Sequence, residues 1–358
     1  MSERRGAVAP ELREPVPSPV SSAARAEWAS SLGRLVRARE AGTLALVLIV
    51  FALVTLKNHD FASASSIQQL LVGASLVALL AVGETMVLVT RNVDLSVGST
   101  LGLCAFVVGN LFRTEHIPVW SGFVIAIALG ALVGAINGLI TVVIKVPSLV
   151  VTLAMLYIIR GLDSKLVNGS IVVPSQVPHA FVDVGFKTVL GIPYLAIIVA
   201  VVVIIVGYAM RTFRPAREMY AIGSSPEAAM LAGIPSGRRV FLAFLTSGAL
   251  AGLGGALFLA LFAQVDNSAG TGYELNVIAA AVVGGVAIFG GSGTVVGAAF
   301  GALLLNTIQQ GLVAVRSSSF WDEAIAGALL LAAIGIDRWL SLRVARGLQS
   351  AEGAHRDL

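Results

Sequence analysis

The sequence predicts an all-α integral membrane protein, and three observations lead to this fold class. Only 12% of the 358 residues are charged, about half of the roughly 25% found in soluble domains. Hydrophobic residues make up 57% of the chain, which is more than a soluble fold of this size could bury. Apolar runs also recur along the chain at the length of ~20 residues that crosses the hydrocarbon of a bilayer as a helix.

These runs predict about ten transmembrane helices. They cover 41–56, 67–90, 95–112, 119–144, 147–162, 191–210, 239–262, 276–290, 294–315 and 322–340. Polar or glycine-rich residues interrupt the pattern near 90–95 and 290–294. We expect broken or re-entrant helices there, because irregular backbone at membrane depth is tolerated only beside protein or a water-filled cavity.

The distribution of charge predicts both the domain organisation and the orientation. Residues 1–40 are polar and rich in arginine, proline and serine, which predicts a cytoplasmic, largely disordered tail with an interfacial helix near 25–40 as the alternative for its second half. Residues 41–345 form the predicted transmembrane domain, with a long cytoplasmic loop at 211–239, and 346–358 form a cytoplasmic C-terminal tail. The predicted inner segments hold 18 of the 24 basic residues, and the outer loops hold five. The positive-inside rule therefore places both termini in the cytoplasm.

Glycines at four-residue spacing predict closely packed helix faces. Gly130, Gly134 and Gly138 share one face of one predicted helix, and Gly297 and Gly301 share one face of another. The strings GALVGAING (130–138) and GAAFGALLL (297–305) are alike, and their helices run in opposite directions. This predicts an inverted repeat, a common plan among transporters. The alternative is chance recurrence in glycine-rich helices.

The loop 211–239 contains a short helix with signals at both ends. Ser225 is a good N-cap, Pro226 suits the first helical position, and Glu227 favours the positive helix end. Gly233 is placed to end the helix, and Ala228 and Ala229 present a small surface suited to a groove. An isolated helix this short is unstable in water, so we favour a docking element over a surface helix without a task.

Polar residues within or beside the apolar runs are candidates for a substrate pathway, because they are costly at membrane depth. The alternative role for Asp94 is to cap the following helix, and for each amide it is to join helices. A further carboxylate, Glu84, lies inside the second run. The pathway candidates are Asn92, Asp94, Ser96, Asn137 and Asn306.

Several functional classes are excluded. A single cysteine, Cys104, permits no disulfide framework, and the four histidines lack metal-ligand spacing. The segment GGSGTVVG (290–297) lacks the lysine of a phosphate-binding loop. No pattern typical of a channel filter or an intramembrane hydrolase is present, and the charge lies at helix ends rather than in a nucleic-acid-binding patch. We therefore expect no catalytic residue, no bound metal or cofactor, and no nucleic-acid partner.

Four motifs resemble those of the membrane permeases of ribose/xylose/arabinose-type ABC importers. They are NVDLSVGS (92–99), PSLVVTLAMLYIIRGL (147–162), EAAMLAG (227–233) and ELNVIAAAVVGGVAIFGGSGTVVGAAFGALLL (274–305). Many such permeases have Gly-Gly where this chain has Arg91-Asn92, and an aromatic residue where it has Ser148. Both departures lean toward the rhamnose and autoinducer-2 branches.

The resemblance implies a type II importer fold and a set of partners. These are cytoplasmic ATPase subunits that use ATP and magnesium, a second permease copy or paralogue, an extracytoplasmic sugar-binding protein and the surrounding lipid. It also implies that Glu227, Ala228, Ala229 and Gly233, with Ser225 and Pro226 at the start of the same helix, belong to the loop that contacts the ATPase. The chain is then expected to import a monosaccharide across the bacterial cytoplasmic membrane. Alternatives are a nucleoside or branched-chain amino acid permease of the same superfamily, or a proton-coupled secondary transporter using Glu84 or Asp94.

Overall fold

The structure is a computed structural model that describes residues 22–167 and 169–316, with isolated helical residues between 321 and 335. Side chains are described from residue 40 onward. The chain divides into two compact units, Met1–Ala38 and Arg39–Leu358. The second unit contains the membrane domain, and the following description concerns that unit.

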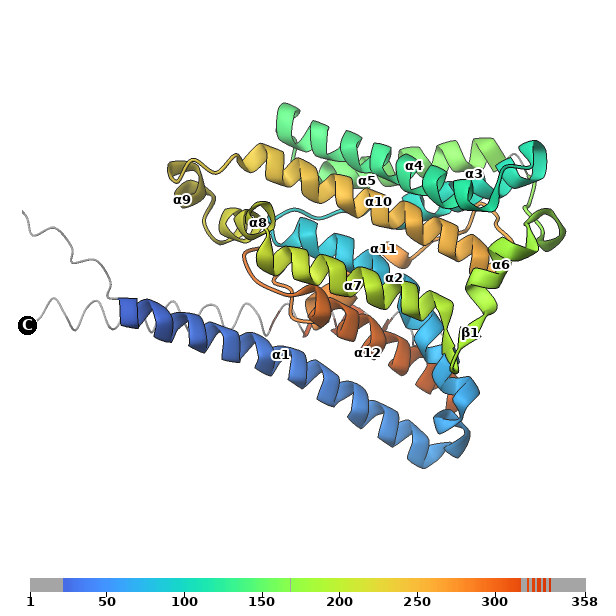
Figure 1. Cartoon of the computed structure of the whole chain (residues 1–358), viewed down its shortest axis with the longest axis horizontal. Helices are drawn as coiled ribbons and strands as arrows, with labels where there is room; N and C mark the ends of the chain where they lie inside the picture. Colours follow the sequence, from blue (N-terminus) through green and yellow to red (C-terminus); the bar gives the residue numbers. More distant parts are fainter. Residues whose placement is uncertain are drawn as a thin grey trace, which may run out of the picture. The chain divides into compact units, whose positions relative to one another are not determined.

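The described residues are overwhelmingly α-helical (Figure 1). The long helices are α1 (Ser22–Lys57), α2 (Ala64–Leu88), α3 (Val97–Glu115), α4 (Val119–Leu139), α5 (Ser148–Val167), α7 (Tyr194–Thr212), α10 (Ser236–Phe262) and α12 (Val295–Ala314). The shorter ones are α6 (His179–Phe186), α8 (Arg214–Ser224), α9 (Pro226–Leu231) and α11 (Tyr273–Val283). A π-helical segment (Ile140–Ile144) extends α4, and 3-10 turns cover His59–Ala62 and Pro174–Gln176.

Helices occupy nine of the ten ranges predicted from the sequence. Among the described residues, seven helices are long and apolar enough to cross a membrane, and α11 is a shorter apolar helix. The all-α membrane fold is therefore confirmed, whereas the number of spans stays a prediction. The tenth range, 322–340, lies outside the continuously described residues, as do 1–21 of the tail and 346–358. α1 begins at Ser22, inside the range predicted as a tail.

One predicted helix is shorter than its apolar run. The run at 276–290 is helical only to Val283, because the chain turns at Gly284-Gly285, where Gly285 has φ +94°. Residues 284–294 and 89–96 are non-helical, apart from single turns. The interruptions predicted near 90–95 and 290–294 are therefore present in the structure.

α10 lies at the centre of the helix packing and contacts α2, α3, α4 and α6, whereas α12 packs on α2 and α11. The contact between α4 and α10 depends on glycine. A Cβ at Gly130 would lie 2.2 Å from the carbonyl oxygen of Gly248, and one at Gly134 would lie 2.2 Å from that of Phe244. Gly301 similarly brings α12 within backbone contact of Ala280 on α11. The predicted close-packing glycine faces are confirmed.

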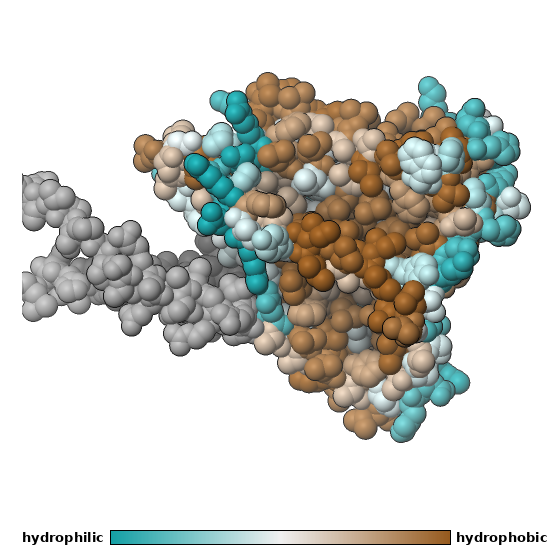
Figure 2. Space-filling view, viewed as in Figure 1, coloured by the Kyte–Doolittle hydropathy of each residue, from teal (hydrophilic) through white to brown (hydrophobic). Residues whose placement is uncertain are grey.

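The surface of the second unit has a broad apolar band between hydrophilic margins (Figure 2). α2 is central, with 78% of its apolar window buried, whereas the membrane-length part of α1 is only 6% buried and α7 only 17%. Leu48, Leu53 and Ile204 are among the large apolar side chains left exposed. Such a band is typical of a multi-pass membrane protein, because contact with lipid replaces the unfavourable exposure of apolar side chains to water.

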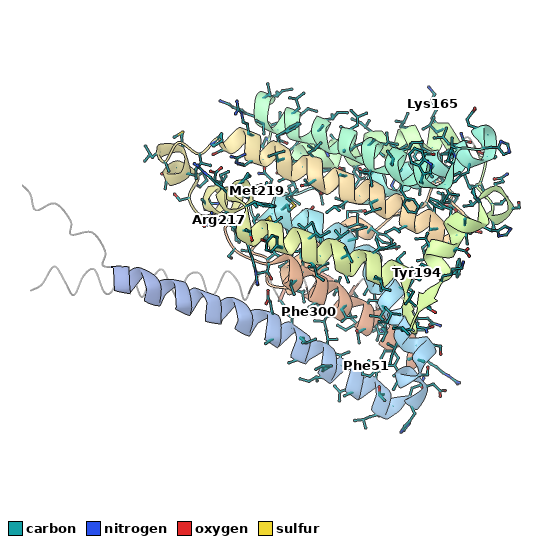
Figure 3. All side chains as sticks on the ribbon, viewed as in Figure 1. Phe51, Lys165, Tyr194, Arg217, Met219 and Phe300 are labelled. Carbon is teal, nitrogen blue, oxygen red and sulfur yellow. The ribbon has the colours of Figure 1, made fainter. Side chains whose placement is uncertain are left out.

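The two ends of the second unit carry different short elements (Figure 1). α8 and α9 project at one end, and α6 lies at the other with a hairpin of β1 (Thr188–Val189) and β2 (Ile192–Pro193). Both hairpin-turn residues, Leu190 and Gly191, have positive φ, as a two-residue hairpin requires. Figure 3 places Arg217 and Met219 at the α8 end and Tyr194 toward the opposite end.

Candidate functional site

α9 is the projecting helix predicted from its sequence, with caps at both ends. The Ser225 hydroxyl oxygen accepts a hydrogen bond from the Ala228 N–H at 3.3 Å, and Pro226 occupies the first helical position. Gly233 has φ +71° and donates to the Met230 carbonyl at 3.0 Å, while Ile234 donates to that of Ala229 at 3.0 Å. These two bonds form a Schellman motif. Both caps therefore end the helix where the sequence predicts.

The exposed face of α9 differs from the one that we expected. Ala229 is 3% exposed and packs within its own chain, so it does not contribute to a small docking surface together with Ala228. Two large apolar side chains, Met230 at 69% and Leu231 at 86%, face outward instead. A helix so short lets neighbouring residues face opposite ways, and packing beneath α9 decides which one is covered. The outward face of α9 is thus apolar and bulky.

α8 is held to the start of α10 by a buried carboxylate between two arginines. Glu218 accepts a hydrogen bond from the Arg214 side chain at 2.7 Å and from the Arg239 side chain at 2.6 Å. These bonds, from Arg239 and then Arg214, lower the pKa of Glu218 below its ordinary value of 4.5. Sequence reasoning missed this residue, although an acid four residues after Arg214 in a loop with five arginines was a usable signal.

We expect Glu218→Gln to loosen the α8–α10 contact and to lower the melting temperature of the purified protein. Because the pKa is depressed on folding, the ionised carboxylate stabilises the fold above its unfolded pKa. That contribution disappears as the pH falls through the lower folded pKa. The wild type should therefore lose melting temperature below about pH 4.5, and the variant should lose less. Glu227→Gln, on exposed α9, is the matched control; equal pH curves for wild type and Glu218→Gln would contradict the assignment.

The two non-helical breaks lie against each other and against α8. The Gly291 N–H donates to the Val89 carbonyl at 3.0 Å, which joins 284–294 to 89–96. From α8, the Tyr220 hydroxyl donates to the Gly293 carbonyl at 3.1 Å. The segment from which α9 projects is therefore in direct contact with both interrupted regions of the membrane domain.

A buried polar cluster lies beside the first break. The Asp94 carboxylate accepts from the Ser96 N–H at 3.0 Å and the Ser96 hydroxyl at 2.6 Å, and Asn137 of α4 donates to the Ser96 hydroxyl at 2.8 Å. The Asp94 N–H donates to Glu84 of α2 at 3.1 Å. All four residues are at most 1% exposed. Glu84 Oε2 and Asn137 Oδ1 are buried acceptors without a hydrogen-bond partner in the described part of the chain.

The structure thus brings three of the five pathway candidates together and adds Glu84. Asn92 instead donates to the backbone and side chain of Thr90 within its own turn. Asn306 on α12 donates to the Leu70 carbonyl of α2 at 2.9 Å, which joins two helices. Asp94 accepts a hydrogen bond from Ser96, the N-cap residue of α3, and does not itself occupy the N-cap position. The described residues hold no group of three or more potential metal ligands.

Comparison with known proteins places the chain in a family of membrane permeases. Residues 66–334 match the family described as branched-chain amino acid transport system / permease component, and the chain belongs to this family. No solved structure matches the chain.

Curated relatives are autoinducer 2 import system permease proteins named LsrC. The chain is 34% identical to that of Enterobacter sp. (strain 638), over 85% of this chain and 88% of the relative. It is 32% identical to that of Photorhabdus luminescens, over 84% and 89%. It is also 32% identical to that of Klebsiella pneumoniae, over 87% and 90%. The resemblance to sugar-type ABC importer permeases, with a lean toward the autoinducer-2 branch, is confirmed.

Proposed function

We propose that this chain is the transmembrane permease subunit of a binding-protein-dependent ABC importer for a monosaccharide or a closely related small polyol. The observation that carries the proposal is α9, a capped helix that projects from the membrane domain with Met230 and Leu231 exposed. Two adjacent large apolar side chains, exposed on a helix that projects from the membrane domain, suit contact with a partner protein. Family membership and the import function named for the relatives support the same reading.

In this account a cytoplasmic ATPase binds α9 and uses ATP and magnesium, while the membrane domain supplies the path. An extracytoplasmic binding protein delivers substrate at the end with α6 and the hairpin, and a second permease completes the cavity. The cluster at the first break holds two buried acceptors without a partner, Glu84 Oε2 and Asn137 Oδ1, which a sugar hydroxyl would reach when the transporter movement exposes them. An unpaired buried acceptor is costly, so a passing hydroxyl donor would gain from it.

Competition for uptake tests the substrate class. Cells expressing the chain with the ATPase and binding protein of its own genome would take up a labelled substrate of the autoinducer-2 or pentose type. We expect excess rhamnose-like or ribose-like sugars to compete. Competition by leucine or uridine alone would assign the chain to the amino acid or nucleoside alternatives instead.

The proposal includes an orientation, with α8 and α9 in the cytoplasm and both termini on that side. Cysteine labelling tests it in a Cys104→Ser background, since Cys104 is buried and is the sole native cysteine. A reagent that cannot cross the membrane should modify Gln264→Cys in intact cells and spare Arg217→Cys, although both positions are exposed. Permeabilised cells should label both. The reverse pattern in intact cells would contradict the orientation.

A further inference from the structure

Arg91 has an unusual backbone conformation at the junction of α8 and the two breaks. Its φ is +64°, a region that costs free energy for residues other than glycine. Such a residue persists when its surroundings hold it in place. Arginine therefore supplies a side chain at this point at a conformational cost.

The Arg91 side chain binds the end of α8. Its Nε donates to the Gly223 carbonyl at 2.5 Å, and its Nη2 donates to the Ser224 carbonyl at 3.0 Å. These are among the last carbonyls of α8, which lack partners within the helix. A positive charge also suits the negative end of a helix. Arg91, from the first break, therefore caps the C-terminal end of α8 with two hydrogen bonds, and α8 leads directly into α9.

The backbones of α8 and of the two breaks are in direct contact at this junction, which leaves no room for a side chain between them. A Cβ at Gly223 would lie within 1.8 Å of the Val89 carbonyl oxygen and 2.4 Å of the Gly291 nitrogen. A Cβ at Gly290 would lie 2.5 Å from Cγ of Arg91. The residue after Ser224 is Ser225, the N-cap of α9. α9 is therefore connected to 89–96 through Ser225, the end of α8 and the two hydrogen bonds from Arg91.

We propose that Arg91 is a positioning residue that fastens α8 and α9 to the break carrying Asp94 and Ser96. It transmits the movement that ATP drives at α9 to the polar cluster in the membrane. The source of the movement rests on the proposed function. The attachment of α8 by Arg91 does not, because its hydrogen bonds lie within this chain.

Arg91→Gly tests the fastening, because glycine accepts φ +64° and removes the side chain without a backbone penalty. In the complete transporter we expect unchanged co-purification of the ATPase. Uptake and the stimulation of ATP hydrolysis by loaded binding protein should fall at least about tenfold, as expected for losing charged hydrogen bonds. Arg91→Lys should restore part of both, since one ammonium cannot reproduce the two-pronged geometry. Normal uptake and stimulation in Arg91→Gly would overturn the proposal.

Lys145→Gly is the matched control. Lys145 also has positive φ, at +61°, and is exposed, and the described contacts give its side chain no hydrogen bond. Amide hydrogen exchange on the purified permease provides a readout independent of transport. Arg91→Gly should accelerate exchange in 89–96 and 223–228 together, and Lys145→Gly should not. Unchanged exchange in Arg91→Gly would overturn the proposal that Arg91 fastens α8 to the first break. If exchange does rise in both segments but the wild-type transporter shows no ATP-driven uptake, the result would contradict the proposed function instead.

Discussion

Leu231→Asp is expected to abolish ATP-driven uptake while leaving the membrane domain folded. Leu231 is 86% exposed at the end of α9, so the change removes little packing within the chain. Burying a leucine in a partner contributes about 1.5–3 kcal/mol, which corresponds to roughly a 10- to 100-fold change in affinity. An aspartate would add the cost of desolvating a charge. Co-purification of the ATPase and uptake should therefore fall together.

Leu190→Asp is the control for this prediction. Leu190 is 98% exposed at the opposite end of the second unit and has φ +51°, a conformation that aspartate tolerates. It should leave ATPase co-purification unchanged. Full ATPase binding by Leu231→Asp would show that the partner docks elsewhere. Ala229→Trp is a poorer test, because Ala229 is buried and tryptophan would disrupt α9 itself.

Asp94→Asn is expected to reduce uptake about tenfold with ATPase assembly intact, because losing a buried hydrogen-bond acceptor costs about 1–3 kcal/mol. The amide oxygen can still accept the bonds from Ser96, so the turn before α3 should form. The second carboxylate oxygen, however, becomes an NH₂ group and can no longer accept a hydrogen bond. Uptake by reconstituted transporter, together with ATPase co-purification, measures the two effects separately.

Asn306→Ser provides the comparison for Asp94→Asn. Asn306 is also buried and polar, but its hydrogen bond to the Leu70 carbonyl only joins α12 to α2. We expect a lower melting temperature without a selective loss of uptake. Equal uptake by wild type and Asp94→Asn would remove Asp94 from the pathway and leave it as a structural residue of the turn.

Local sequence signals predicted local structure well. Apolar run length located nine helices, and the serine, proline and glycine around α9 located its caps. Glycine spacing identified the faces at which α4 and α12 pack, because only glycine allows backbones to approach so closely. Each of these features depends on residues that are neighbours along one helix.

Features that depend on distant segments were not predictable from one sequence. The exposure of Leu231 and burial of Ala229 depend on what packs beneath α9. The bonds from Arg91 to Gly223 and Ser224 join residues more than 130 positions apart. The grouping of Glu84, Asp94, Ser96 and Asn137 requires α2, the first break and α4 to meet. The inverted repeat stays a prediction.

We propose that a partner ATPase, acting through α9, drives substrate through this chain. The most direct measurement is uptake into proteoliposomes containing the chain, its ATPase and its loaded binding protein, with a proton ionophore present throughout. We expect accumulation that requires ATP and the binding protein, is unaffected by the ionophore, and is lost in Leu231→Asp. Uptake by the chain alone that collapses with the ionophore would contradict it and would establish a proton-coupled transporter.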